Sequence, residues 1–193
     1  MSYAAVAQRV RVPVGFLLAA FYLIFARPTP LTLAVGAIVA FVGVLFRAWA
    51  AGHIVKNHEL ATTGPYAHTR NPLYFGSFLI AAGFAIAAHW GFLLPVIAFF
   101  GFVYLPVIER EREFIRSRFP GTYDEYERNV PAFVPRPAPW RTHGGGGASA
   151  HGMRSHFDFG LYLRHREWQA ALAYVIVILF LILRMRGALL WTP

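Results

Sequence analysis

The stretch PLYFGSFLIAAGFAIAAHWGFLLPVIAFFGFVYLPVI decides the fold, and it runs from Pro72 to Ile108 without a charged residue. As one helix it would measure about 55 Å, whereas the hydrocarbon core of a bilayer is about 30 Å thick. The sequence His89-Trp90-Gly91 near its middle is a natural place for a break. The stretch therefore predicts two membrane-spanning helices, 72–89 and 91–108, joined by a tight turn.

Three further apolar stretches are long enough to be spans, at 10–26, 31–55 and 168–183. Because a bilayer core offers no water to the backbone, each span has to satisfy its own hydrogen bonds, and continuous rather than alternating apolar runs favour helices over barrel strands. The sequence predicts an all-α, polytopic membrane protein with about five transmembrane helices, forming a single domain over residues 1–193.

Composition supports a protein whose solvent is largely lipid. Hydrophobic residues make up 57% and charged residues 14% of the chain, against about 45–50% and about 25% in soluble domains. Eighteen Lys and Arg residues outnumber nine Asp and Glu residues, and cysteine is absent. The basic residues lie in or beside the gaps between apolar stretches, which favours contact with anionic lipid headgroups over nucleic acid.

The polar region 109–166 is rich in arginine, so the positive-inside rule places it in the cytoplasm. Counting back through the paired spans puts the N-terminus and the segment 56–71 on the same side. The polar segments 56–71 and 109–135 should therefore meet at one membrane face and enclose a site open to both cytosol and lipid. Between this region and the last span, the glycine-rich sequence within 136–156 predicts a flexible linker.

The first polar segment carries the sequence GPYAHTRNPLYFG at residues 64–76. Gly64 and Pro65 indicate a turn, and Asn71 before Pro72 is typical of a helix start, which presents free backbone N–H groups to an anion. Arg70, Tyr66, His68 and Tyr74 add charge and rings. The structural alternative is a turn, a helix cap and interfacial aromatic residues.

The second polar segment, 109–119, continues the preceding span as a helix. At helical spacing Ile108, Ile115 and Phe119 share one stripe, which Glu111 and Arg112 flank. A carboxylate beside an apolar stripe at a membrane surface requires a cationic partner. The alternative is an interfacial helix with ion pairs such as Glu109–Arg112.

Two other features allow a functional and a structural interpretation. Arg47 lies inside the second span, where it either extends toward the interface or takes part in a site. His53, His58 and His68 lack the spacing of a known metal site, so no metal is predicted.

The two motifs together resemble those of the isoprenylcysteine carboxyl methyltransferase family, which is related to the membrane phospholipid N-methyltransferases. Residues 64–76 are similar to its G-x-Y-x-x-x-R-H-P-x-Y-x-G stretch, and residues 111–131 to E-E-x(6)-F-G-x(2)-Y-x(2)-Y-x(3)-V-P. Asn71 stands where the family has histidine, Arg112 where it has a second glutamate and Pro120 where it commonly has glycine.

The resemblance implies a membrane-embedded methyltransferase that uses S-adenosylmethionine. It implies that Glu111 pairs with the ammonium group of the cofactor, that Arg70 or Arg47 orients a carboxylate acceptor, and that His68 is the candidate base for an amine acceptor. The implied cofactor-binding residues are Gly64, Pro65, Tyr66, His68, Asn71, Pro72, Tyr74, Glu111, Tyr123 and Tyr126.

The expected reaction is carboxyl methylation of an isoprenylcysteine-like acceptor, and the expected partners are lipophilic small molecules, prenylated or lipid acceptors and membrane lipids. Three alternatives stay open: a phospholipid amine N-methyltransferase, an NADPH-dependent membrane reductase of the sterol-reductase type, and a non-catalytic membrane scaffold. The reductase is less favoured because Glu111 would repel the phosphates of NADPH.

Overall fold

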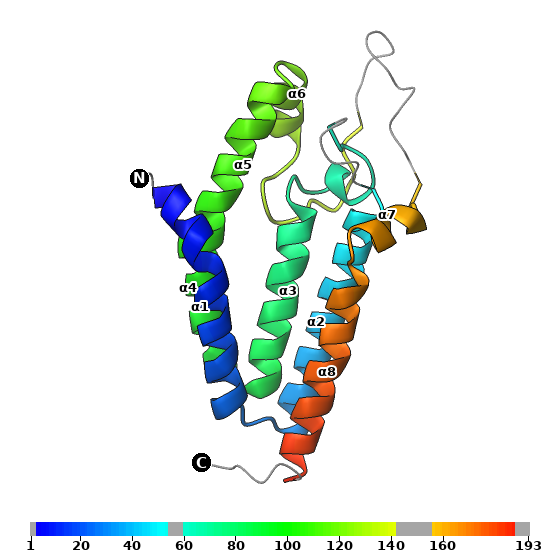
Figure 1. The fold of residues 1–193 in the computed structure, drawn as a ribbon. Helices are drawn as coiled ribbons and strands as arrows, with labels where there is room; N and C mark the ends of the chain where they lie inside the picture. Colours follow the sequence, from blue (N-terminus) through cyan, green and yellow to red (C-terminus); the bar gives the residue numbers. More distant parts are fainter. Residues whose placement is uncertain (1–2, 54–59, 142–155, 188–193) are drawn as a thin grey trace.

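Helix α3 (Pro72–Ala88) lies at the centre of the fold and contacts helices on every side. The computed structural model describes residues 3–53, 60–141 and 156–187, and all of the regular structure in these ranges is helical. Figure 1 shows α3 between a layer formed by α1 and α4–α5 and a layer formed by α2 and α8. The elements in chain order are α1 (Tyr3–Phe25), α2 (Pro30–Ala51), α3, α4 (Leu93–Phe99), α5 (Leu105–Arg118), α6 (Thr122–Asn129), α7 (Phe159–Arg164) and α8 (Trp168–Met185).

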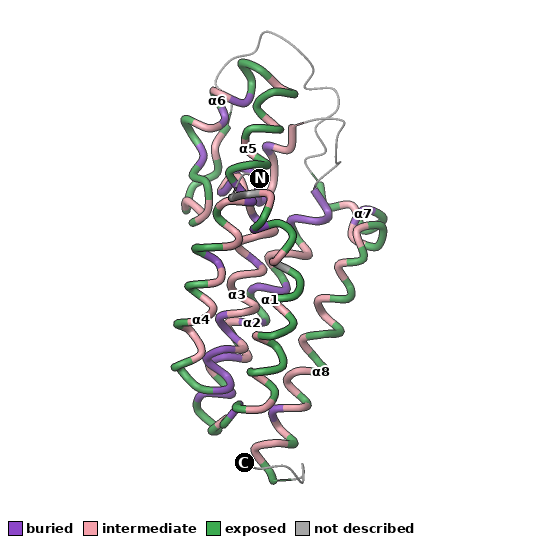
Figure 2. Tube along the Cα trace, turned by 60° about the vertical axis from the view of Figure 1, so that its left-hand side comes forward, coloured by how far each residue is buried: buried purple, intermediate pink, exposed green. Residues whose placement is uncertain are grey.

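The all-α, polytopic membrane class predicted from the sequence is confirmed. Within the described residues, three helical segments are long and apolar enough to cross a bilayer, namely Pro30–Ala51, Trp90–Arg118 and Trp168–Met185, while Val12–Phe25 and Pro72–Ala88 are shorter apolar helices. The count of five spans stays a prediction. Large apolar side chains such as Leu31 and Leu94 are exposed on the outer faces, and Figure 2 shows exposed residues along the outer helices, as expected for surfaces that face lipid.

The break predicted near the middle of the 72–108 stretch is confirmed. Helix α3 ends at Ala88, and the His89 side chain accepts a hydrogen bond from the Gly91 N–H, 3.0 Å away, at the start of a short 3₁₀ turn. Helices α4 and α5 are continuous through a π-helical segment, Phe100–Tyr104, so Trp90–Arg118 forms one long helix. A π-helical segment changes which side chains face the helix's neighbours, and such segments are frequent at functional sites.

Glycines allow α2 and α3 to pack with their backbones in direct contact. A Cβ at Gly83 would lie 2.3 Å from the Ala40 N, and one at Gly43 would lie 2.7 Å from the Gly76 O. Small residues at helix crossings are the usual device for close packing in membranes. This crossing holds the start of α3, and therefore the 64–76 motif, in a fixed place beside α2.

At the opposite end of the molecule, Arg184 of α8 caps the last turn of α1. Its three guanidinium nitrogens donate to the carbonyl oxygens of Leu23, Ile24 and Ala26 at 2.6–3.0 Å. These carbonyls have no partner within their own helix because they belong to its last turn. Arg184 therefore joins the first and last long helices of the chain.

Three predicted boundaries differ from the structure. Helix α1 begins at Tyr3 rather than near residue 10, because its polar first turns continue the helix beyond the apolar run. Helix α2 ends at Ala51, where Gly52 caps it, and the rest of the predicted 31–55 span is either turn or, from 54, outside the described residues. The predicted linker does not begin at 136, because the Arg136 and Trp140 N–H groups bond to the His68 and Ala67 carbonyls; residues 142–155 of that linker lie outside the described residues.

Candidate functional site

The two polar segments meet at one end of the helical bundle, as predicted. The Arg70 N–H donates to the Pro131 O at 2.9 Å, and the Tyr126 hydroxyl donates to the Tyr66 O at 2.7 Å. These bonds join residues 60–71 to residues 109–135, and residues 56–59 lie outside the described ranges. The motif at 64–76 and the motif at 111–131 therefore form one site.

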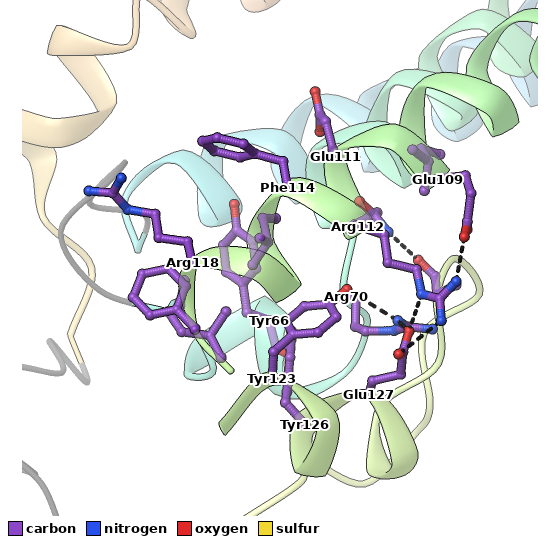
Figure 3. Close-up of a pocket in the computed structure, with 17 residues that line it drawn as sticks. Tyr66, Arg70, Glu109, Glu111, Arg112, Phe114, Arg118, Tyr123, Tyr126 and Glu127 are labelled. Atoms are coloured by element: carbon purple, nitrogen blue, oxygen red, sulfur yellow. Dashed lines mark hydrogen bonds and ion pairs between the residues drawn. The ribbon is translucent and has the colours of Figure 1, made fainter. Parts of the chain in front are cut away.

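A first cavity of about 530 Å³ lies between these segments. Helix α5 supplies one wall and α6 another, and residues of the 60–71 loop line the cavity between them (Figure 3). The predicted stripe of Ile108, Ile115 and Phe119 lines it, together with the rings of Tyr66, Tyr123 and Tyr126. The cavity thus combines an apolar, aromatic surface with charged groups at its edge, which is typical of a small-molecule site.

The charged edge is a chain of alternating acids and arginines. Glu127 of α6 pairs with Arg70 and with Arg112, whose Nε lies 2.5 Å from Glu127 Oε1, and Arg112 also pairs with Glu109. Figure 3 shows this chain along one side of the cavity, with Glu111 apart from it. The hydrogen bond from Arg112, together with that from Arg70, holds the pKa of Glu127 below its usual range. Glu127 is therefore a carboxylate at neutral pH.

One nitrogen of the Arg70 side chain makes no hydrogen bond within the described residues. Its Nη1 contacts Glu127 and the Tyr123 hydroxyl, the latter at 3.2 Å. Its Nε is buried and has no hydrogen-bond partner among the described residues. A buried donor without a partner is costly, so this nitrogen is suited to an anionic or carbonyl group of a ligand.

The three tyrosines of the first cavity stay protonated over the physiological range. Burial raises the pKa of Tyr66, Tyr123 and Tyr126. Their hydroxyls therefore act as hydrogen-bond donors and their rings as neutral aromatic surfaces, which is suitable for contact with a cation.

A second cavity of about 760 Å³ lies deeper among the long helices. Its apolar wall comes from α1 and α4, with Val12, Phe16 and Phe99. Its polar end holds Arg47 of α2 and Glu167, the residue before α8. The cavity therefore offers apolar contact to a long chain and a polar end to a headgroup.

Glu111 is the residue that lines both cavities. Its Oε1 accepts a hydrogen bond from the Tyr74 hydroxyl at 2.7 Å. Tyr74 and Tyr104 both line the second cavity, and their rings meet edge to face with centroids 5.6 Å apart. A carboxylate and two rings therefore mark the junction of the two cavities, and we call Tyr74, Tyr104 and Glu111 the junction cluster.

The structure divides the residues expected to form the site into three groups. The first cavity is lined by Tyr66, Arg70, Asn71, Glu111, Tyr123 and Tyr126, and the second by Arg47, Tyr74 and Glu111. Gly64, Pro65, His68 and Pro72 line neither cavity and shape the loop instead. Gly64 adopts a φ of 57° against the His53 ring, where a Cβ would lie 2.4 Å from the ring.

Two of these expectations require correction. His68 does not face either cavity, because its Nδ1 lies 2.8 Å from the Arg136 carbonyl oxygen, so the structure does not place it as a base. Asn71 does precede α3, but its side chain does not cap the helix; its Nδ2 donates to the Ala132 O at 2.8 Å instead. The side chain thereby ties the loop to the second motif.

Sequence reasoning missed Glu127, Tyr104 and Glu167. Glu127 follows Tyr123 at i+4 and so shares a face of α6 with it, which means that helical spacing from Tyr123 carried a signal for it. Tyr104 and Glu167 had none, because their places depend on the π-helical segment and on the packing of α8. Within the described ranges, no group of three His, Cys, Asp or Glu side chains comes together as a metal site.

The fold and site define an integral membrane protein with one cavity at the polar end of its helical bundle and a second cavity among its long helices, and Glu111 lines both. Residues 14–121 match the phospholipid methyltransferase family, and the chain belongs to this family. The expected membership of the membrane isoprenylcysteine and phospholipid methyltransferase superfamily is confirmed. The match runs from within α1 to the end of α5, and it leaves out α6, which supplies Glu127, and Glu167, the residue before α8.

Two similar proteins carry names that refer to metal resistance. The chain is 36% identical over 111 residues to the cobalt-zinc-cadmium resistance protein CzcN of Cupriavidus metallidurans, covering 56% of this chain and 51% of that protein. It is 36% identical over 107 residues to the nickel-cobalt-cadmium resistance protein NccN of Alcaligenes xylosoxydans xylosoxydans, covering 54% and 50%. The chain thus spans about half the length of the curated relatives it matches. No solved structure matches it.

Proposed function

We propose that the protein transfers a methyl group from S-adenosylmethionine to a lipophilic acceptor in the membrane. The cofactor occupies the first cavity, and the acceptor enters the second cavity from the bilayer. The observation that carries this proposal is that the two cavities share Glu111. A donor and an acceptor that bind in separate cavities with one common wall meet there and nowhere else.

The residues of the first cavity fit the cofactor group by group. Its volume of about 530 Å³ lies within the usual range for ligand sites, about 300–1,000 Å³. Glu111 suits the ammonium group, and the Arg70 Nε without a partner suits the carboxylate. The rings of Tyr66, Tyr123 and Tyr126 suit the adenine and the positive sulfur. Arg70 is thus proposed for the cofactor rather than the acceptor, because it lines the first cavity and not the second.

Positioning supplies most of the rate in this reaction. S-adenosylmethionine supplies a methyl group on a positively charged sulfur, and the acceptor's lone pair forms the new bond to carbon as the carbon–sulfur bond breaks, leaving a neutral thioether. The chain's task is to hold the nucleophile in line with the breaking bond and to exclude water. The junction cluster lies where this alignment is needed, and Tyr74 is fixed there by its bond to Glu111.

The structure favours an amine or another uncharged nucleophile over a carboxylate as the acceptor. Carboxyl methylation of an isoprenylcysteine-like molecule needs a cation in the second cavity, and Arg47, which lines it, is already paired with Glu167. An amine acceptor can bind without breaking the Arg47–Glu167 ion pair. It has to lose a proton before its nitrogen attacks the methyl group. Carboxyl methylation stays the second candidate, favoured by the presence of Arg47 in the cavity.

Titration of the purified protein with S-adenosylhomocysteine and with NADPH tests the proposal against its alternatives. A methyltransferase binds S-adenosylhomocysteine and not NADPH, because Glu111, the acid of the first cavity that lies outside the chain of ion pairs, would repel the phosphates of NADPH. A sterol-type reductase gives the reverse result. A scaffold binds neither ligand.

We also propose that the end of the molecule bearing the first cavity faces the cytosol. Arg110, Arg112, Arg116 and Arg118 of α5 all lie at this end, and positive residues favour the cytoplasmic side. The cofactor then arrives from the cytosol and the acceptor from the bilayer.

A further inference from the structure

The polar end of the second cavity is a single ion pair between residues 120 positions apart in the chain. Arg47 Nε lies 2.9 Å from Glu167 Oε2, and Arg47 Nη2 lies 2.7 Å from Glu167 Oε1. This is the parallel, two-bond geometry in which an arginine and a carboxylate bind most specifically. The Glu167 side chain is only 10% exposed and the Arg47 side chain 25%.

The remaining guanidinium nitrogen of Arg47 is also engaged. Its Nη1 donates to the Leu73 carbonyl oxygen and to the Ser77 hydroxyl, both in the first turns of α3. Gly76 makes room for this side chain, since a Cβ there would lie 2.6 Å from the Arg47 Cγ. All three guanidinium nitrogens of Arg47 therefore donate to groups of the protein. Nε and Nη2 donate to the Glu167 carboxylate, and Nη1 donates to α3.

The backbone turns sharply to bring Glu167 to this place. Arg166 has a φ of 56°, and it is the non-glycine residue with a positive φ in the described chain. Such a conformation is unfavourable at a non-glycine residue and persists where its surroundings require it. The turn sends Glu167 toward α2 at the start of α8, in a part of the chain that lies outside the family match.

The pair neutralises Arg47 at the polar end of the second cavity, and the carboxylate of Glu111, at the junction with the first cavity, is the other acid on its lining. If an anionic headgroup took Arg47, Glu167 would be left as an almost buried carboxylate without a partner, which is strongly unfavourable. If Glu167 were absent, Arg47 would attract anions into the cavity, and the low dielectric there would strengthen the effect.

We propose that Glu167 determines which headgroups the second cavity accepts, by neutralising Arg47 so that the cavity takes lipophilic molecules without a permanent negative charge. This inference rests on the proposed function only in that the ligand of this cavity is taken to be the methyl acceptor. Glu167 is a specificity-determining residue here, and Arg47 is its fixed counter-ion.

The test compares three probes with the same alkyl chain and different headgroups. Dodecane-1-sulfonate is a permanent anion, dodecyltrimethylammonium a permanent cation and dodecan-1-ol neutral. Their binding is measured by calorimetric titration of the full chain in nanodiscs of phosphatidylcholine, with empty nanodiscs as the blank. The wild type should bind the sulfonate no better than the alcohol.

Charge variants should shift this preference in opposite directions. Glu167→Gln should raise the affinity for the sulfonate relative to the alcohol at least tenfold, because Arg47 loses its counter-ion. Arg47→Gln should raise the relative affinity for the ammonium probe instead, and the double variant should return to the wild-type order. Glu113→Gln is the matched control, since Glu113 is an exposed acid of α5 that lines neither cavity.

Unchanged preferences in Glu167→Gln and Arg47→Gln would overturn the inference, as would a wild type that prefers the sulfonate. If Glu167→Gln does not fold, Arg47→Gln and the double variant still give the predicted opposite shift and its reversal. The titrations contain no cofactor, so their failure is distinct from a failure of the protein to bind S-adenosylhomocysteine.

Discussion

Glu111 holds a position that no other described residue shares, on the walls of both cavities. Its side chain is exposed to the cavities rather than buried in the fold, and its hydrogen bond to Tyr74 is the contact that fixes it. A charge-assisted bond to a ligand contributes about 1.5–3 kcal/mol, so this carboxylate matters more for binding than for folding.

We expect Glu111→Ala to weaken S-adenosylhomocysteine binding by at least tenfold while the protein stays folded. The reason is the loss of the carboxylate that pairs with the ligand's ammonium group. Titration calorimetry measures the affinity, and the thermal unfolding temperature reports the fold. The control variant Glu113→Ala, on the same helix, should bind S-adenosylhomocysteine normally. Normal affinity in Glu111→Ala would refute the pairing of Glu111 with the ligand's ammonium group.

Glu127 makes a separate, pH-dependent prediction. Because its pKa is lowered in the folded protein, its contribution to stability is complete above the usual pKa of a glutamate, about 4.3, and is lost as the pH falls through the lowered value. The wild type should therefore be more stable than Glu127→Gln at neutral pH, and the difference in unfolding temperature should vanish in acid. A difference that does not change with pH would contradict this account.

At the scale of the elements, glycine contacts hold α2 against α3. We expect Gly83→Ala to lower the free energy of unfolding by about 1–3 kcal/mol, as overpacking does, because its Cβ would lie 2.3 Å from the Ala40 N. Gly101→Ala is the control, since nothing lies within 4 Å of a Cβ there. Denaturation in detergent measures the stability of both variants. Equal stability of Gly83→Ala and Gly101→Ala would show that α2 and α3 have room to separate.

Arg184 predicts a comparable effect at the other end of the bundle. Arg184→Ala should destabilise the protein by about 2 kcal/mol, because two carbonyls of the last turn of α1 and that of Ala26, directly after it, lose a charged donor. Arg186→Ala, an exposed neighbour, should have little effect. Similar unfolding curves for the two variants would show that water replaces the Arg184 contacts at no cost.

Local sequence patterns predicted the elements well and the contacts between distant elements poorly. The charge-free run from Pro72 to Ile108 and its break at His89 were readable because they depend on neighbouring residues. The stripe of α5 and the convergence of the two motifs followed from helical spacing and from counting spans. The Arg184 cap, the Arg47–Glu167 pair and the ion pair of Glu127 with Arg70 were not readable, because each joins residues that only packing brings together.

At the scale of the whole molecule, the arginine-rich end defines a proposed orientation. The chain has no cysteine, so single cysteines report the side of the membrane without background. We expect Ser117→Cys, at the exposed end of α5, to react with a membrane-impermeant maleimide that is added to the cytosolic side of the membrane, and not with one added to the other side. Trp90→Cys, in the turn at the opposite end, should react from the other side. Labelling of both from one side would contradict the orientation.

The most direct test of the central claim is transfer of a labelled methyl group. The purified protein in nanodiscs is incubated with a membrane lipid extract and S-adenosylmethionine that carries a radioactive methyl group, and the organic phase is counted. We predict that label enters a lipophilic product, and that Glu111→Ala abolishes this while Glu113→Ala does not. Label that stays in the aqueous phase although the protein binds S-adenosylhomocysteine would contradict a lipophilic acceptor, and equal labelling by Glu111→Ala would contradict the shared site.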